Sequence, residues 1–392
     1  MKVLHVINTM SVGGAELHLL TLCRRLKKQG IELGVVYLRE KVKGSRSLRG
    51  DFENENIPVF DLHANGRYDP RFFHRFARIL KRERPDILHT HLPRADLAGA
   101  FAHFLDPSLV WISSVHGIYS AQWSGGWTLP LFKRLWRGAD AMLCISEAVR
   151  RWLIEGGISE DKAKLIYYGI EAKPFSRPAA DLRQAWGLDG GAVIGSIGRL
   201  EPRKNHECLI RAMPEICRGV PDAKLLIAGH DPLGYGQKLN RLIGELSLGD
   251  SVKVVGFQSD VASFLDAIDV FAFATRSEGF GLVIVEAMAA GKPVVASDIA
   301  PLTEIVIDGE TGVLVECENP DAFAASLSRL LRSPDERLRM GSLGRQRVQT
   351  HFTAERMSCE TRTLYEGLFH RPSASEALLA DATKLEKGYR GQ

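Results

Sequence analysis

The sequence predicts an α/β protein built from two doubly wound domains. Short apolar runs bounded by turn residues alternate with longer amphipathic stretches, which is typical of parallel strands buried between helices. This order begins again near residue 190, and 392 residues exceed the length of one ordinary domain. With 45% apolar and 25% charged residues, the composition supports two packed cores and excludes a disordered chain.

Each half of the chain offers a series of strand candidates. In the first half they are residues 3–8, 33–38, 57–61, 86–90, 110–114, 141–145 and 165–168. In the second half they are residues 193–197, 224–228, 252–255, 270–274, 293–296 and 313–315. We therefore expect two Rossmann-like domains that face each other, with ligands bound beyond the carboxyl ends of their strands.

A proline-bearing segment over residues 171–179 interrupts both periodicities and predicts the interdomain linker. We expect an N-terminal domain over residues 1–178 and a C-terminal domain over residues 179–352. Residues 353–392 are expected to form a helix that returns to the N-terminal domain, followed by a polar tail.

The sequence offers no pattern for export, for a membrane span or for a metal. The first residues lack a signal-peptide pattern, and no apolar run approaches the ~20 residues that cross a bilayer. The six cysteines are scattered, with no CxxC pair and no metal-ligand spacing, as expected in a reduced compartment. We therefore expect a cytoplasmic protein without a bound metal, at most peripheral on the inner face of the cytoplasmic membrane.

The densest motif follows the fourth strand candidate of the second half. A loop with Glu278 leads into Gly279-Phe280-Gly281 and then into a helix that carries Glu286. Glycines let backbone N–H groups approach a ligand and a helix N-terminus favours negative charge, so this turn suits a diphosphate. Glu286 could accept two hydroxyl hydrogen bonds from a ribose, and Glu278 lies nearer to where a sugar would be. The alternative is that both glutamates only complement the helix dipole.

Two further turns from strand to helix could meet a phosphate. One contains Arg199 and Lys204, whose charges could stabilise a leaving diphosphate; the alternative is a solvated loop that caps a helix. The other, Gly13-Gly14 at the front of the chain, either approaches a ligand or only makes a tight turn. It is not the dinucleotide fingerprint GxGxxG.

Histidines follow two strand candidates of the first half. His116 comes just beyond residues 110–114, where a side chain would face a ligand, although a single histidine is more often structural. His89 and His91 alternate along a strand and its end, and we interpret them as packing or surface residues.

Together these motifs resemble the retaining GT-B glycosyltransferases of family 4, the group 1 glycosyltransferases, over nearly the whole chain. The motifs that recur in the family's order are Gly13-Gly14, His116-Gly117, Ser146-Glu-Ala-Val, Gly198-Arg-Leu with Lys204, Ala228-Gly229, Gly256-Phe257 and Glu278-x7-Glu286. The last of these is the most specific. Two departures, at residues 230–232 and 300–302, border the donor site and leave the base and the sugar open.

The resemblance implies that a sugar moves, with retention, from a nucleoside-diphosphate-sugar donor to a glycan or lipid-linked acceptor in cell-surface polysaccharide or glycolipid synthesis. The donor is a substrate, so no cofactor is expected, and no nucleic acid partner. The implied site residues are Arg199 and Lys204 at the diphosphate, Glu286 at the ribose, Gly256 and Phe257 at the base, Glu278, Gly279, Phe280, Gly281 and Leu282 at the donor sugar and phosphate, Gly14 at the phosphate from the other domain, and His116 beside the reacting sugar.

Three alternatives stay open. A nicotinamide oxidoreductase would use similar domains, but the GxGxxG fingerprint is absent. A nucleotide-sugar epimerase or phosphorylase would keep the fold and change the chemistry. A non-catalytic sugar-nucleotide-binding protein would tolerate the loss of Lys204 or Glu278. No clear pair of carboxylates indicates the double displacement of retaining hydrolases.

The net charge of +4 is unevenly distributed along the chain. Residues 1–178 contain 27 Lys and Arg against 18 Asp and Glu, whereas residues 179–392 contain 24 against 29. Residues 71–84 predict an amphipathic helix. Its stripes are Phe72, Phe76, Ile79 and Leu80 on one side and Arg71, Arg75, Arg78 and Arg82 on the other. Aromatic and basic residues also follow His116, up to residue 137. We hypothesise peripheral contact with an anionic membrane; the alternative is a core-packed helix with a solvated basic face.

Overall fold

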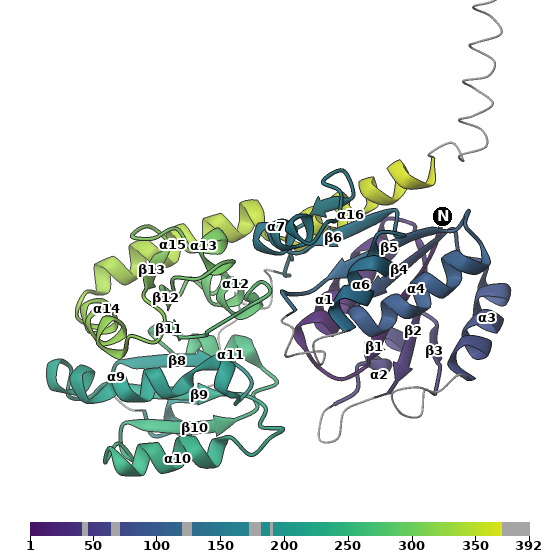
Figure 1. Ribbon diagram of the computed structural model, residues 1–392. Helices are drawn as coiled ribbons and strands as arrows, with labels where there is room; N and C mark the ends of the chain where they lie inside the picture. The colour runs from purple at the N-terminus through teal and green to yellow at the C-terminus, as the bar shows by residue number, and fades with distance from the viewer. Residues whose placement is uncertain (41–45, 64–70, 120–127, 172–181, 189–190, 371–392) are drawn as a thin grey trace, which may run out of the picture.

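The computed structural model describes residues 1–40, 46–63, 71–119, 128–171, 182–188 and 191–370. It contains two parallel sheets, one in each half of the chain, with helices on both faces (Figure 1). The domain boundary predicted at residue 178, the aromatic residues Trp123 and Trp127, and the polar tail lie outside the described residues.

The first sheet has seven strands in the order β3-β2-β1-β4-β5-β6-β7. The strands are β1 (Lys2–Thr9), β2 (Glu32–Arg39), β3 (Val59–Asp61), β4 (Ile87–His91), β5 (Val110–Val115), β6 (Ala141–Cys144) and β7 (Ala163–Leu165). The helices that accompany them are α1 (Gly14–Lys28), α2 (Arg49–Asn54), α3 (Arg71–Glu83), α4 (Pro93–Leu105), α6 (Thr128–Trp136) and α7 (Glu147–Glu155). The adjacent residues Val3 and Leu4 point to opposite faces of the sheet, and both are 0% exposed. Both faces are therefore covered, which explains why this strand is a continuous apolar run.

The second sheet has six strands in the order β10-β9-β8-β11-β12-β13. The strands are β8 (Val193–Ile197), β9 (Lys224–Ala228), β10 (Val252–Gly256), β11 (Val270–Phe273), β12 (Val294–Ser297) and β13 (Gly312–Val315). The helices of this half are α8 (Leu182–Ala185), the 3-10 turn η2 (Pro202–Lys204), α9 (His206–Gly219), α10 (Gly236–Glu245), α11 (Val261–Asp266), α12 (Leu282–Ala289), α13 (Leu302–Ile305), α14 (Pro320–Arg332) and α15 (Pro334–His351). All strand pairs in both sheets are parallel, and the predicted fold of two doubly wound α/β domains is confirmed.

The last described helix, α16 (Ala354–Phe369), packs against α1 of the first half (Figure 1). Thr353 begins it by accepting a hydrogen bond from the backbone N–H of Arg356 at 3.2 Å. The N–H of Ile170 donates to the carbonyl of Phe352, and the N–H of Ala354 donates to the carbonyl of Ile170, both at 2.9 Å. The chain that follows the second sheet is thus tied to the end of the first half.

One strand differs from its predicted position. The sequence predicts residues 165–168, whereas β7 covers Ala163–Leu165. The ladder ends there because its partner β6 ends at Cys144, opposite Leu165, and the chain enters α7 from Ser146. Among the described helices, none combines the length and the apolar character that a bilayer crossing requires.

Candidate active site

The Gly-rich turn after β11 lies directly against the first half of the chain. Gly281 is the N-cap of α12 and has φ of +108°, which side-chain-bearing residues rarely adopt. A Cβ added to Gly279 would lie 2.2 Å from the carbonyl oxygen of His116 and 2.9 Å from the Cα of Gly117. Only glycine permits this approach. The Gly279 motif of the second half therefore contacts the His116-Gly117 motif of the first half.

The N-terminus of α1 approaches the same turn. Gly13 is its N-cap, and a Cβ added to Gly14 would lie 3.8 Å from Cδ1 of Leu282, the first residue of α12. Burial raises the pKa of the Glu16 carboxyl in the first turn of α1, while its own backbone N–H, a hydrogen bond from the Thr9 hydroxyl and the charge of Arg199 oppose that rise. Two helix N-termini with positive partial charge thus come together beside an arginine, an arrangement that suits an anion.

A buried ion pair lies in the second half of the site. The Nζ of Lys204 is in direct contact with Oε1 of Glu278, and both side chains are 11% exposed. Arg203 lies 3.7 Å from the same carboxylate oxygen. Burial lowers the pKa of Lys204, and the neighbouring Glu278 carboxylate opposes that decrease. The sequence does not predict that these two site residues pair with each other.

Glu286 carries a carboxyl group for which the described part of the chain provides no partner. The residue lies inside α12 and is partly buried, and within the described part of the chain its carboxyl makes no hydrogen bond or ion pair. Burial raises its pKa to about 7. A desolvated carboxyl of this kind is available to accept hydrogen bonds from ligand hydroxyls.

Three motif glycines lie side by side where β8, β9 and β10 end. The N–H of Gly198 donates to the carbonyl of Ala228 at 3.0 Å, and the N–H of Gly229 donates to the carbonyl of Gly256 at 2.9 Å. A Cβ on Gly229 would lie 1.8 Å from the Gly198 carbonyl oxygen, so the backbones can meet only without a side chain there. Phe257 is 54% exposed at this edge and offers an aromatic face to a base.

The side chain of Phe280 points into the protein. It is 2% exposed, and its ring centroid lies 5.3 Å from that of Tyr168 in the first half. The part of Phe280 that remains for a ligand is its backbone.

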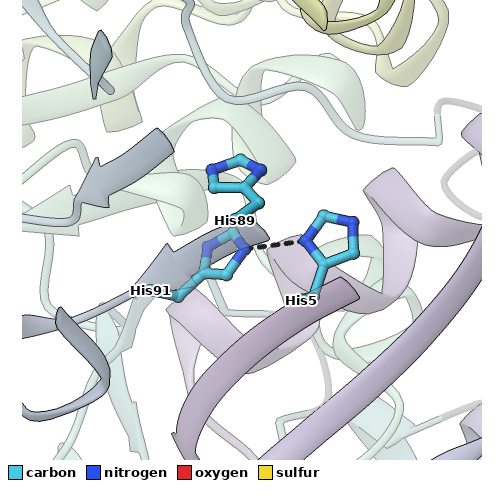
Figure 2. A group of neighbouring side chains, drawn as sticks. All are labelled: His5, His89 and His91. Carbon is cyan, nitrogen blue, oxygen red and sulfur yellow. Dashed lines mark hydrogen bonds between the residues drawn. The ribbon is translucent and has the colours of Figure 1, made fainter. Parts of the chain in front are cut away.

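His116 belongs to a hydrogen-bonded group that sequence reasoning missed. Its Nε2 lies 3.1 Å from Nδ1 of His91, and its Nδ1 bonds to the Tyr168 hydroxyl. Nε2 of His91 in turn lies 3.0 Å from Nδ1 of His5 on β1 (Figure 2). Burial lowers the pKa of both His5 and His116 to about 3, so the imidazoles are neutral.

Of the two interpretations of His89 and His91, as packing or as surface residues, the surface one is wrong, and the packing one leaves out their hydrogen bonds. Both are 0% exposed, and both nitrogens of each ring are hydrogen-bonded. The available signal is the HxH spacing on β4, because the register pairs His89 with His5 and so places all three rings on one face.

These three histidines also resemble a metal centre in their spacing. His5, His89 and His91 each have a nitrogen within 4.8 Å of the others (Figure 2). However, the nitrogens of His89 already bond to the hydroxyls of Tyr365 at 2.6 Å and Ser114 at 2.7 Å. The contacts therefore favour a hydrogen-bonded network over a metal site.

Glu304 is a second residue that sequence reasoning missed. Its carboxylate accepts hydrogen bonds from the backbone N–H groups of Glu147 at 2.7 Å and Ala148 at 2.8 Å, at the N-terminus of α7. Beside it, the Ser146 hydroxyl donates to the carbonyl of Gly279 at 3.1 Å. These contacts hold the first half against the Gly-rich turn, and no local pattern in the sequence indicates them.

Comparison of the chain with known proteins identifies its family. The model described as Glycosyltransferase Family 4 matches residues 12–173, and the model described as Glycosyl transferases group 1 matches residues 179–347. A GDP-mannose-dependent alpha-(1-6)-phosphatidylinositol monomannoside mannosyltransferase of Mycolicibacterium smegmatis is 31% identical over 284 residues, which cover 68% of this chain and 72% of that protein. The chain belongs to the group 1 glycosyltransferases.

A second relative agrees with the family, and a solved structure agrees with the fold. A phosphatidyl-myo-inositol mannosyltransferase of the same organism is 28% identical over 354 residues, or 86% of each chain. The crystal structure of Anabaena HepE in complex with UDP and glucose matches with a TM-score of 0.84 and 23% identity, covering 93% of this chain and 99% of that one. The fold is therefore GT-B, as predicted.

The glycosyltransferase fold brings most of the predicted site residues together. The two halves touch at Gly14 against Leu282 and at Gly279 against His116. Nearby, the charge of Arg199 acts to lower the pKa of Glu16. The Lys204–Glu278 pair belongs to the part of the site that the second half of the chain provides. Gly256 and Phe257 lie at a separate edge of the second sheet, connected to this region through Gly229 and Gly198.

Proposed function

We propose that this glycosyltransferase moves a hexosyl group from a nucleoside-diphosphate-sugar, with retention and without a metal ion, to a glycan or lipid-linked acceptor. The observation that supports this most is the meeting of the α1 and α12 N-termini at Gly14 and Leu282, beside Arg199. Backbone N–H groups, helix dipoles and a guanidinium would together stabilise the charge that develops on a departing diphosphate. Lys204 would act with them if its ammonium group contacts the ligand phosphate as well as the carboxylate of Glu278.

The other predicted residues would each bind a different part of the donor. The carboxyl of Glu286, which has no partner among the described residues, would accept hydrogen bonds from both ribose hydroxyls, and exposed Phe257 would face the base. Glu278 would contact the sugar, and His116 would lie beside the reacting carbon. One relative is named for its dependence on GDP-mannose, and HepE was crystallised with UDP and glucose, so both bases belong in the first screen.

We also propose that the acceptor is at a membrane, on the cytoplasmic side, and that the reaction serves glycolipid or cell-surface polysaccharide synthesis. The names of two relatives specify phosphatidylinositol-based acceptors. In this chain α4 packs between α3 and α6. These helices expose the apolar residues Phe73, Leu97, Phe104, Leu105 and Leu131. Exposed basic residues on α3, on α6 and directly after α6 are Arg71, Arg78, Lys81, Arg82, Arg134 and Arg137. Such a mixture favours an anionic bilayer interface.

Product analysis tests the transfer. The purified protein would be incubated with UDP-glucose or GDP-mannose and with vesicles that contain phosphatidylinositol, and the lipids analysed by mass spectrometry and NMR. We expect a glycosylated lipid whose anomeric configuration matches that of the donor. Inversion would overturn the retaining mechanism, and donor turnover to an isomer without acceptor would support an epimerase instead.

Co-sedimentation with vesicles tests the membrane contact separately. We expect binding to anionic vesicles at low salt, reduced in a variant with Arg71, Arg78 and Arg82 changed to Gln, since each basic residue contributes about 1 kcal/mol near such a surface. Arg75 is left unchanged because it donates hydrogen bonds to the carbonyls of Leu62 and His63.

The matched control removes the same charge elsewhere. Arg211, Arg218 and Arg241 are exposed on α9 and α10 of the second half, and their change to Gln is expected to leave vesicle binding intact. Equal binding to neutral and anionic vesicles, or equal losses in both triple variants, would contradict docking through α3.

A further inference from the structure

A chain of hydrogen bonds runs through the first sheet and ends at the candidate active site. It begins at His5 on β1, passes through His91 on β4 and His116 beyond β5, and ends at the hydroxyl of Tyr168. The register explains the alignment: His91 pairs with Ser114, and His116 lies two residues further on, in the direction of the same face. Figure 2 shows the first step, between His5 and His91.

The buried end of this chain determines where the protons lie. A neutral imidazole has one N–H donor and one bare nitrogen acceptor. Nε2 of His5 is buried and has no hydrogen-bond partner among the described residues, and buried N–H groups without an acceptor are rarer than under-satisfied acceptors. The proton of His5 therefore belongs on Nδ1, from which it is donated to Nε2 of His91. It follows that Nδ1–H of His91 donates to Nε2 of His116.

We propose that His91 is a positioning residue for sugar transfer: its Nδ1–H holds Nε2 of His116 and so fixes the tautomer in which Nδ1–H of His116 donates to Tyr168. The inference rests on the proposed function. Both ring nitrogens of His116 are then engaged, so His116 acts by its position and not as the base that removes the acceptor's proton. What His91 positions is the turn whose carbonyl touches Gly279, beside the site proposed for the donor sugar.

The surroundings of His116 support a neutral, fixed ring. The groups that face it are His91, Tyr168, His18 on α1, whose ring lies 5.8 Å away, and the Tyr119 hydroxyl 3.3 Å from its backbone N. His5 and His89 lie behind His91. None of these groups is a carboxylate that would favour an imidazolium, and burial lowers the pKa of His116 to about 3.

Two amide substitutions separate the two hydrogen bonds of His91. An Asn amide reaches the position of Nδ1 and can still donate to His116, whereas a Gln amide reaches the position of Nε2 and keeps the contact with His5. We expect His91→Asn to retain kcat, and His91→Gln to lower kcat on the order of 10- to 100-fold with little change in the donor KM. The control is His103→Gln, since His103 on α4 lies beside Trp111 and outside the chain of hydrogen bonds.

NMR of protein with ¹⁵N-labelled histidine reads the tautomer directly and does not depend on a variant's folding. We expect the wild type to carry the His116 proton on Nδ1, and His91→Asn to keep it there. A proton on Nε2, equal kcat losses in both His91 variants, or one stoichiometric metal ion per chain that is lost in His5→Gln would overturn the proposal. A wild type that transfers no sugar would overturn the proposed function, and the tautomer measurement would still decide the hydrogen-bonded chain.

Discussion

The carboxyl group of Glu286 makes donor affinity depend on pH. Burial raises its pKa to about 7 in the free protein, and no protein group within the described residues satisfies it. If two ribose hydroxyls donate to the carboxylate, binding favours the ionised form and returns the pKa toward its ordinary value of 4.5. Nucleoside diphosphate affinity should then be weaker by about tenfold at pH 6 than at pH 8, because each pH unit below the free pKa costs about 1.4 kcal/mol.

Calorimetric titration with UDP or GDP between about pH 5.5 and 8.5 measures this dependence. The terminal phosphate of the ligand also titrates, with a pKa near 6, so the profile of the wild type alone is ambiguous. Glu286→Gln is the control, since the amide is neutral throughout and the ligand's own titration cancels in the ratio of the two dissociation constants. A ratio that does not change with pH would refute the assignment of Glu286 to the ribose.

The same carboxyl group has a readout without ligand. Its folded pKa exceeds the unfolded value, so its contribution to stability is complete below about pH 4.5 and is lost as the pH rises through about 7. The stability of Glu286→Gln relative to the wild type should therefore increase from pH 5 to pH 8, by up to about 3 kcal/mol in the free energy of unfolding. A constant difference in denaturant unfolding would show that the carboxyl is not desolvated.

Three further outcomes are expected of the site. Gly279→Ala should reduce transfer at least tenfold by forcing the halves apart, since its Cβ would lie 2.2 Å from the His116 carbonyl oxygen. The control is Gly249→Ala, which should have no effect in the same assay because its Cβ would meet no neighbouring group of the described residues within 4 Å. Arg199→Ala and Lys204→Ala should each lower kcat by about 100- to 1000-fold, and near-wild-type turnover in both folded variants would remove the diphosphate assignment. Transfer should survive EDTA, whereas loss on chelation that Mg²⁺ or Mn²⁺ restores would reveal a metal requirement.

Local pattern determined much of this protein. The apolar runs predicted the strands of both sheets, with only β7 displaced, because strands covered on two faces need continuous apolar residues whatever their neighbours are. The Gly-rich turns were visible for a similar reason, since Gly281 must reach a positive φ and Gly279 must lie against another backbone. The sequence alone also carried the family resemblance, through motifs in a characteristic order.

Only the tertiary structure decided which distant groups meet. The partners of His116 depend on the register of three strands, which the HxH spacing of His89 and His91 does not give by itself. Tyr365 reaches His89 because α16 packs back onto α1, and Glu304 reaches the N-terminus of α7 from the other sheet. Propensity and periodicity depend on a few adjacent residues, whereas these contacts arise from packing between segments far apart in the chain, so no local pattern could encode them.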